Sequence, residues 1–294
     1  AGETPVALED EVRIVSLLSW RYRNPAWVLA RRLGLVVGDL VYTTPGGQSP
    51  QSLVNRTALD ISSGRTDLVL LAGGEAWRTR MRIKRSDTVV DWAKAPESVP
   101  PQTIGDELEL THPVEAAKGI CLPIQVYPLF ESALRAAAGT SPAQHVAELA
   151  ELWSRFSAVA ATNPHAWKRE ALTPDQVATV TAGNRIVGLP YRKVMNANND
   201  VDMAAAIIMC SAERAGTLGI PRDRWVFPHA GTDCHEHAWV SNRWSLAEAP
   251  AIRIGGRRAL DLAGVGIDDV ALVDLYSCFP SAVRAAAASL GLDL

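Results

Sequence analysis

The N-terminal part of the chain shows the apolar periodicity of a strand–helix–strand unit. Residues 39–43 predict a short strand, and the apolar positions within 51–63 recur at helical spacing. Ser49 and Pro50 suit the start of that helix, because a hydroxyl caps free backbone N–H groups and proline has none to leave free. Residues 67–72 then predict a buried strand. The unit has the length expected for a right-handed β–α–β crossover.

Helical patterns dominate the middle of the chain. Residues 128–138 and 141–161 predict helices, and Pro142 suits the first turn of the second. An apolar stripe at helical spacing runs along this second helix, formed by Val146, Leu149, Trp153, Phe156 and Ala160. Residues 95–125 are rich in proline and acidic residues and predict an irregular segment. Residues 78–185 are therefore expected to form a helical insertion over an α/β core.

The last third of the chain returns to an α/β pattern. Residues 203–211 and 225–227 predict strands, and residues 250–263 predict a helix that ends at Gly264. Residues 270–275 form an apolar run typical of a strand that is buried on both faces. Two α/β units separated by a helical insertion predict a pseudo-symmetric α/β fold.

Tyr276, Ser277 and Cys278 follow that last predicted strand, and Pro280 then opens a helix that runs to Leu290. Open α/β sheets bind ligands at the carboxyl ends of their strands, and a helix N-terminus favours negative charge. These three side chains are therefore candidates for a binding or catalytic site. The alternative is a strand-to-helix corner that carries no chemistry.

Composition narrows the classes of function. The 294 residues are 48% hydrophobic and 21% charged, as in an ordinary globular protein. A formal charge of −3 gives no basic footprint for nucleic acid. No apolar run approaches the ~20 residues of a membrane span, and no signal peptide begins at Ala1. The four cysteines are widely spaced without a CxxC pair, which indicates reduced thiols and a cytoplasmic protein.

Several potential metal ligands cluster between Phe227 and His237, among them His229, His235 and His237. Structural zinc sites draw paired ligands from two places in the chain, and no second pair occurs here, so no metal is expected. The segment is more consistent with a solvated loop or one that lines an active site. In the second case His229, His235 or His237 would serve as a general acid or base.

Three stretches resemble thiolases. Asn196 and the run 202–206 resemble the thiolase Asn…Asp-Gly-Ala-Ala-Ala stretch, and 250–264 resembles the run that leads to the next motif. Tyr276-Ser-Cys-Phe279 stands where sterol-carrier-protein-type thiolases have His-Asp-Cys-Phe. Gly47-Gln-Ser49 with the following helix resembles the thiolase nucleophile loop. The resemblance covers roughly residues 38–76 and 190–294, and the second block is the more specific.

This resemblance implies an α/β, thiolase-like layered α/β/α/β/α fold of two pseudo-symmetric halves with a helical loop-domain insertion. The expected parts are residues 1–77, an N-terminal half without its first strand, residues 78–185, the insertion, and residues 186–294, a C-terminal half without its last strands. Thiolases commonly pair their N-half strands across a two-fold axis, so a homodimer through residues 67–72 is a further expectation.

The resemblance also implies a coenzyme A thioester as substrate or ligand, no covalently bound cofactor, and the acyl transfer of an acetyl-CoA acetyltransferase in lipid metabolism. Thiolases attack the thioester with a cysteine at the start of the first-half helix. Gly47 occupies that position here, and only Gln48 and Ser49 offer side chains nearby. The thiolase Gly-His-Pro and Cys-x-Gly motifs have no counterpart in this sequence.

The candidate catalytic residues are therefore Tyr276, Cys278, His229 and His235, and the candidate substrate-binding residues are Gly47, Gln48, Ser49, Ser277 and His237. Two alternatives to acyl transfer stay open. One is retro-aldol cleavage of a β-hydroxyacyl-CoA with Tyr276 as the base, its pKa lowered by the helix N-terminus. The other is a protein that binds acyl-CoA without catalysis.

Overall fold

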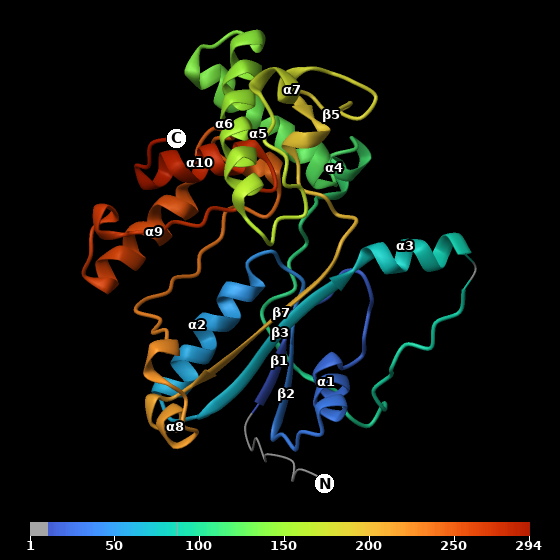
Figure 1. Cartoon of the computed structure of the whole chain (residues 1–294), viewed down its shortest axis with the longest axis vertical. Helices are drawn as coiled ribbons and strands as arrows, with labels where there is room; N and C mark the ends of the chain where they lie inside the picture. The colour runs from blue at the N-terminus through green and yellow to red at the C-terminus, as the bar shows by residue number, and fades with distance from the viewer. Residues whose placement is uncertain (1–10, 87) are drawn as a thin grey trace. The chain divides into compact units, whose positions relative to one another are not determined.

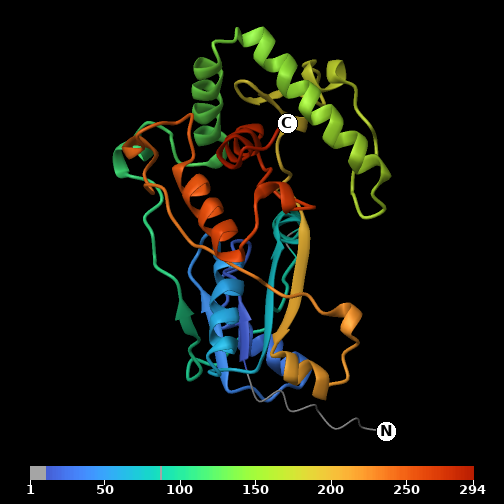
Figure 2. The same ribbon diagram turned by 90° about the vertical axis from the view of Figure 1, so that its left-hand side faces the viewer.

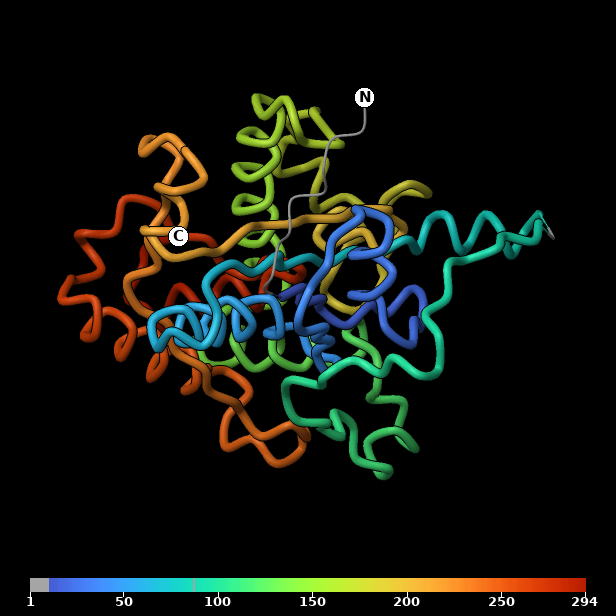
Figure 3. Tube along the Cα trace, turned by 90° about the horizontal axis from the view of Figure 1, so that it is seen from below, coloured from blue at the N-terminus to red at the C-terminus, as the bar shows by residue number. Residues whose placement is uncertain are grey.

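The computed structural model describes residues 11–86 and 88–294 and divides into two compact units (Figures 1, 2 and 3). The first unit comprises the described residues up to Glu107 together with Asn198–Thr232. The second comprises Leu108–Ala197 and Asp233–Leu294. Residues 198–232 belong to the first unit because β7, within them, pairs with β3. The three-part division stays a prediction.

The first unit is an α/β domain built on one five-stranded sheet. The strands lie in the order β4 (Gln102–Ile104), β2 (Asp39–Thr43), β1 (Glu11–Ile14), β3 (Leu68–Ala76) and β7 (Asp202–Cys210). The first four are mutually parallel, and β7 runs antiparallel to β3. The strands expected over 39–43, 67–72 and 203–211 are confirmed to within a few residues.

Helices cover both faces of this sheet. Val12 and Ile14 of β1 pack against Ala26 and Ala30 of α1 (Pro25–Leu33). On the opposite face, β3 packs against Leu53 of α2 (Ser49–Ser62). The chain moves outward from β1 to β2 and then back past β1 to β3. Right-handed crossovers in opposite directions place their helices on opposite faces, as Figures 1 and 2 show.

Local sequence sets the ends of α1. The Asn24 side chain accepts a hydrogen bond from the Trp27 backbone N–H at 3.0 Å, and Pro25 occupies the first turn. Gly34 ends the helix at φ 69°, a left-handed conformation that side chains disfavour. Both ends of this helix are therefore set by residues within one turn. The remaining helices of the unit are α3 (Trp77–Ser86), which buries no residue, and the short α8 (Ala212–Thr217).

Asp60 on α2 anchors the helix to the sheet through a buried ion-pair cluster. Its carboxylate lies 2.8 Å from Arg13 of β1, which is 3% exposed, and also pairs with Arg56 and Arg65. Burial alone would raise the pKa of Asp60, but hydrogen bonds from Arg65 and Arg13 outweigh it and hold the pKa below its usual value. The ionised form of Asp60 therefore stabilises the folded state.

Asp60 is expected to make the stability of the chain sensitive to acid. Its contribution is complete above the unfolded-state pKa of about 3.9 and is lost as the pH falls through the lower folded-state pKa. In urea unfolding at a series of pH values, the difference in free energy of unfolding between wild type and Asp60→Asn should be constant above about pH 5 and shrink below it. The exposed Asp268→Asn is the control. A difference that grows toward low pH would contradict the assignment.

The second unit is mainly helical. Its helices are α4 (Pro113–Ala117), α5 (Pro123–Ala138), α6 (Pro142–Thr162), α7 (Pro174–Ala178), α9 (Pro250–Ala263) and α10 (Pro280–Leu290). A two-stranded hairpin, β5 (Ile186–Gly188) with β6 (Tyr191–Arg192), joins them. The core of the unit centres on Leu149, Val177, Tyr191, Met195 and Phe279. The helices expected over 141–161, 250–263 and 281–290 are confirmed, and α5 begins five residues before the expected Pro128.

Three expectations are wrong. Residues 270–275 form no strand, and Leu272 is 91% exposed. Residues 225–227 form no strand either, and Val226 is 91% exposed. An apolar run becomes a strand only where a partner strand completes its hydrogen bonds, and among the described residues neither run joins the five-stranded sheet or the β5–β6 hairpin. Residues 67–72 are not a dimer edge, because β3 pairs with β1 on one side and with β7 on the other.

None of the helices in the described ranges is both long and apolar enough to cross a membrane.

Candidate functional site

The loop before α2, in the first unit, offers no free nucleophile. Gly47 has no side chain, and a Cβ built there would meet no heavy atom within 4 Å. Ser49 is buried, and its hydroxyl donates a hydrogen bond to the Thr44 carbonyl at 3.1 Å. Gln48 is the N-cap residue of α2, and its amide lies over Gly46 rather than capping the helix. Gly47, which the sequence resemblance places at the position of the thiolase cysteine, therefore has open space beside it just before α2.

The segment Tyr276–Phe279, in the second unit, leads directly into α10. Phe279 is the N-cap residue and is 7% exposed, while the Cys278 carbonyl accepts a hydrogen bond from the Ala197 N–H at 3.0 Å. Tyr276 is 58% exposed, and Ser277 lines a surface hollow of about 440 Å³. The segment is thus fixed at its buried end and presents Tyr276 and Ser277 to solvent. Its predicted place at a helix N-terminus is confirmed.

Tyr276 lies beside Cys278 and Tyr127 of α5. The rings of Tyr276 and Tyr127 are 6.5 Å apart between centroids. Partial burial raises the pKa of the Tyr276 phenol well above its ordinary value of 10.0, and the interactions with Cys278 and Tyr127 raise it further. The phenol is therefore protonated at neutral pH. The expected lowering of its pKa by the helix N-terminus is wrong, because burial and these two neighbours outweigh the helix dipole.

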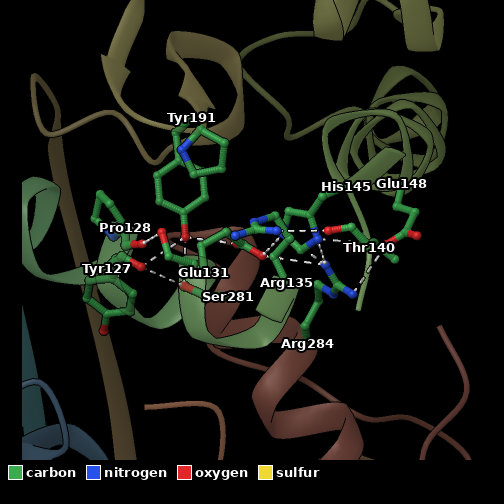
Figure 4. Close-up of polar contacts among 12 residues, drawn as sticks. Tyr127, Pro128, Glu131, Arg135, Thr140, His145, Glu148, Tyr191, Ser281 and Arg284 are labelled. Carbon is green, nitrogen blue, oxygen red and sulfur yellow. Dashed lines mark hydrogen bonds and ion pairs between the residues drawn. The ribbon is translucent and has the colours of Figure 1, made fainter. Parts of the chain in front are cut away.

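A cluster of buried polar side chains lies behind this segment, and Figure 4 shows its contacts. We call it the Glu131 cluster; its members are Glu131, His145, Tyr191, Ser281 and Arg284. Glu131 is fully buried and accepts hydrogen bonds from the Tyr191 hydroxyl at 2.9 Å and from His145 Nε2 at 2.8 Å. The Tyr191 hydroxyl lies 2.7 Å from that of Ser281. One carboxylate thus connects α5, α6, β6 and α10.

Arg284 lies against the His145 ring. Its Nη1 is 3.2 Å from His145 Nδ1 and 3.3 Å from His145 Nε2. Arg284 also lies 3.5 Å from Glu131 and supplies a positive charge beside the buried carboxylate. Glu148 pairs with the outer face of Arg284 at 3.4 Å.

The three histidines of the segment 227–237 are all exposed. His229 lies in the first unit, as do Gly47, Gln48 and Ser49, while His235 and His237 lie in the second unit with Tyr276. The neighbouring Cys234 and Glu236 contact α9: the Cys234 thiol donates to the Ala251 carbonyl at 2.9 Å, and the Glu236 carboxylate accepts from the Ala251 N–H at 2.7 Å. Within the residues that the structure covers, no three His, Cys, Asp or Glu side chains gather closely enough to hold a metal.

Sequence reasoning missed Tyr127 and the Glu131 cluster. The cluster could have been found from an ionisable residue, His145, that shares the apolar face of the predicted helix 141–161. His145 lies four and seven positions before Leu149 and Leu152, and all three are buried. Phe156, which was assigned to the apolar stripe, is instead 41% exposed. The buried face of α6 therefore includes His145 and Leu152 and leaves Phe156 near its edge.

Known proteins were compared with the chain by sequence and by structure. Neither a family model nor a curated protein sequence matches it. The crystal structure of a monomeric SCP2-thiolase-like protein type 1 from Mycobacterium smegmatis matches 97% of the chain with a TM-score of 0.78 and 31% sequence identity. An Ltp2–ChsH2(DUF35) aldolase structure matches 96% with a TM-score of 0.63 and 18% identity, which shows the fold alone. The chain spans 54% of the length of the first of these chains and 66% of the second.

The fold and the motif segments define the chain as an α/β protein with a thiolase-like fold. More narrowly, its fold is that of the SCP2-thiolase-like proteins, as the resemblance in sequence implied. Gly47 in the first unit and the Tyr-Ser-Cys-Phe segment in the second unit are the two places where the sequence was expected to depart from the thiolase pattern.

Proposed function

We propose that the protein containing this chain binds an acyl-CoA thioester and cleaves the carbon–carbon bond of a β-hydroxyacyl-CoA, with Tyr276 as the proton donor. The observation that carries this proposal is the phenol of Tyr276, which is 58% exposed at the N-terminal end of α10 and lies beside the ring of Tyr127. A protonated phenol donates a hydrogen bond or a proton where negative charge develops. The open space at Gly47 supports the proposal, because ping-pong acyl transfer needs a nucleophile there.

The retro-aldol step balances without a covalent intermediate. A base removes the proton of the β-hydroxyl, and the bond between Cα and Cβ breaks. The β carbon leaves as a ketone or aldehyde, and the electron pair of the broken bond forms the enolate of the thioester. Tyr276 protonates Cα of this enolate and recovers a proton from the base through solvent, so no proton is consumed overall. The role of Tyr276 as the base, expected from the sequence, is replaced by that of the acid.

The comparison with known structures agrees with this proposal. One matched structure is described as an Ltp2–ChsH2(DUF35) aldolase, and another as a monomeric SCP2-thiolase-like protein. By this similarity we propose that the present protein acts as a monomer or with a DUF35-type partner rather than as a homodimer through β3, whose two edges are both paired.

The second candidate function is acyl-CoA binding without catalysis. The observation that favours it is that the Ser49 hydroxyl is engaged with Thr44 and that Gly47 has no side chain. The two candidates share the ligand and differ only in the role of Tyr276. Loss of the Tyr276 hydroxyl would leave affinity unchanged in both cases but would abolish turnover only in the first.

The test is a cleavage assay on the full chain with a β-hydroxyacyl-CoA, following the shortened acyl-CoA by liquid chromatography and mass spectrometry. Tyr276→Phe is expected to lower the rate about 100-fold or more, because a positioned acid typically contributes at least that factor. Tyr22→Phe, which removes a half-buried phenol in the first unit, is the matched control. Binding of the acyl-CoA without cleavage by wild type would support the second candidate, and equal rates for wild type and Tyr276→Phe would refute the role of Tyr276.

A further inference from the structure

We infer that Tyr127 is a positioning residue for Tyr276 and that the Glu131 cluster fixes Tyr127 in that role. This inference deepens the proposed function and rests on it, because it gives the acid a built partner in the same unit. The evidence is the packing of the Tyr127 ring, the attachment of its backbone to the cluster, and the closeness of the two phenol rings.

The Tyr127 ring is held on two sides. It stacks on Phe279 with a centroid distance of 4.3 Å and an interplanar angle of 11°, and it meets Phe130 edge to face at 5.6 Å. Phe279 lies three residues after Tyr276 and also contacts the ring of Tyr191 at 5.6 Å. The Tyr127 ring is thus packed directly on the segment that carries Tyr276. The contacts with Phe279 and Phe130 therefore limit the side-chain rotation of Tyr127.

The backbone of Tyr127 is held by the Glu131 cluster. Its carbonyl lies 3.3 Å from the Tyr191 hydroxyl and 3.4 Å from the Ser281 hydroxyl. Figure 4 shows the carbonyl of Tyr127 facing these hydroxyls while its ring points away from the cluster. Glu131 lies one helical turn further along α5, so the same contacts fix that turn of the helix. Ser281 is the second residue of α10, so the cluster ties Tyr127 to the start of that helix.

The rings of Tyr127 and Tyr276 are neighbours, with centroids 6.5 Å apart and an interplanar angle of 33°. Burial raises the pKa of the Tyr127 phenol and the neighbouring Tyr276 opposes that rise, whereas burial and then Cys278 and Tyr127 raise the pKa of Tyr276. A phenylalanine would fill the stacking site on Phe279 equally well, so the hydroxyl of Tyr127 is not required for packing. We assign it to the orientation of the Tyr276 hydroxyl.

The test places 3-fluorotyrosine at position 276 and records its fluorine NMR signal, which responds to the surroundings of the phenol and needs no substrate. Tyr127→Phe is expected to move the signal, because the partner hydroxyl is lost while the ring stays. Tyr191→Phe is expected to move it in the same sense, since the cluster then holds the Tyr127 backbone less firmly. Ser281→Ala is the second variant of the cluster, in case Tyr191→Phe does not fold. Tyr22→Phe should leave the signal unchanged.

The outcomes separate this inference from the proposed function. A signal that does not move in folded Tyr127→Phe overturns the pairing of the phenols. A signal that moves in Tyr127→Phe but not in Tyr191→Phe or Ser281→Ala overturns the role of the cluster. In the cleavage assay, Tyr127→Phe should lower kcat about 10-fold with little change in KM. A moved NMR signal without any cleavage by wild type would leave the pairing in place and contradict the proposed function alone.

Discussion

Replacing Glu131 with leucine is expected to lower the free energy of unfolding by about 3–5 kcal/mol, the usual range for removing one partner of a buried ion pair. The substitution leaves the Tyr191 hydroxyl and the His145 Nε2–H without their acceptor and the Arg284 guanidinium without its buried counter-charge. Leucine fills a similar volume, so the loss comes from the unpaired polar groups rather than from a cavity. Urea unfolding followed by circular dichroism measures the effect.

Two control substitutions separate the charge from the hydrogen bonds. Glu131→Gln keeps an acceptor oxygen and should cost less than Glu131→Leu, because only the charge is lost. Glu148, whose side chain is 46% exposed, is the outer partner of Arg284. Glu148→Gln removes its charge and should change the free energy of unfolding by about 1 kcal/mol or less. If Glu131→Leu were as stable as wild type, the cluster would not connect the four elements as described.

Gly47→Cys is expected to create a reactive thiol where the chain has none. An added Cβ meets no neighbour there, and the position immediately precedes the N-cap of α2, whose partial positive charge favours a thiolate. A pKa lowered toward about 7 would make alkylation by iodoacetamide near neutral pH about 10-fold faster than at an ordinary exposed cysteine. Peptide mass spectrometry measures the rate for this residue alone, separately from the natural cysteines.

The matched control is Gly183→Cys, at an exposed loop glycine with no close neighbour and no helix N-terminus. Gly47→Ser is the second control, because it places a hydroxyl at the same point. Incubation with acetyl-CoA then shows whether the new thiol accepts an acyl group. Equal alkylation rates at positions 47 and 183 would show that the α2 terminus does not activate a thiol.

The elements with strong local signals could be predicted from the sequence. The helix Pro25–Leu33 follows from the Asn24 cap, the first-turn proline and the terminal Gly34, all of which act within one helical turn. The β2–α2–β3 unit follows from apolar periodicity. The thiolase resemblance was carried by short motifs, and the comparison of structures confirms the fold that it implied.

The errors lie where structure depends on distant partners. The apolar run 270–275 carries the pattern of a buried strand, but pattern alone does not supply the neighbouring strand that would pair with it. The prediction that residues 67–72 form a dimer edge is wrong for the opposite reason: a partner strand is present, because β7, far along the chain, pairs with β3 there. Tyr127 and Tyr276 are 149 positions apart, and only the fold brings their rings to 6.5 Å.

The chemistry of the site was predicted in part. The place of Tyr276 before α10 and the absence of a nucleophile at Gly47 were visible in the sequence. The raised pKa of Tyr276 was not, because it depends on burial and on Cys278 and Tyr127 rather than on the helix terminus.

The most direct test of the central claim, that this site acts on a thioester without a covalent acyl-enzyme, is the intact mass of the wild-type protein during incubation with a β-hydroxyacyl-CoA, with the nucleotide products analysed in parallel. We predict an unchanged protein mass together with a shortened acyl-CoA. A stable or transient acyl adduct on the wild-type chain, accompanied by free coenzyme A, would contradict the account and restore nucleophilic acyl transfer.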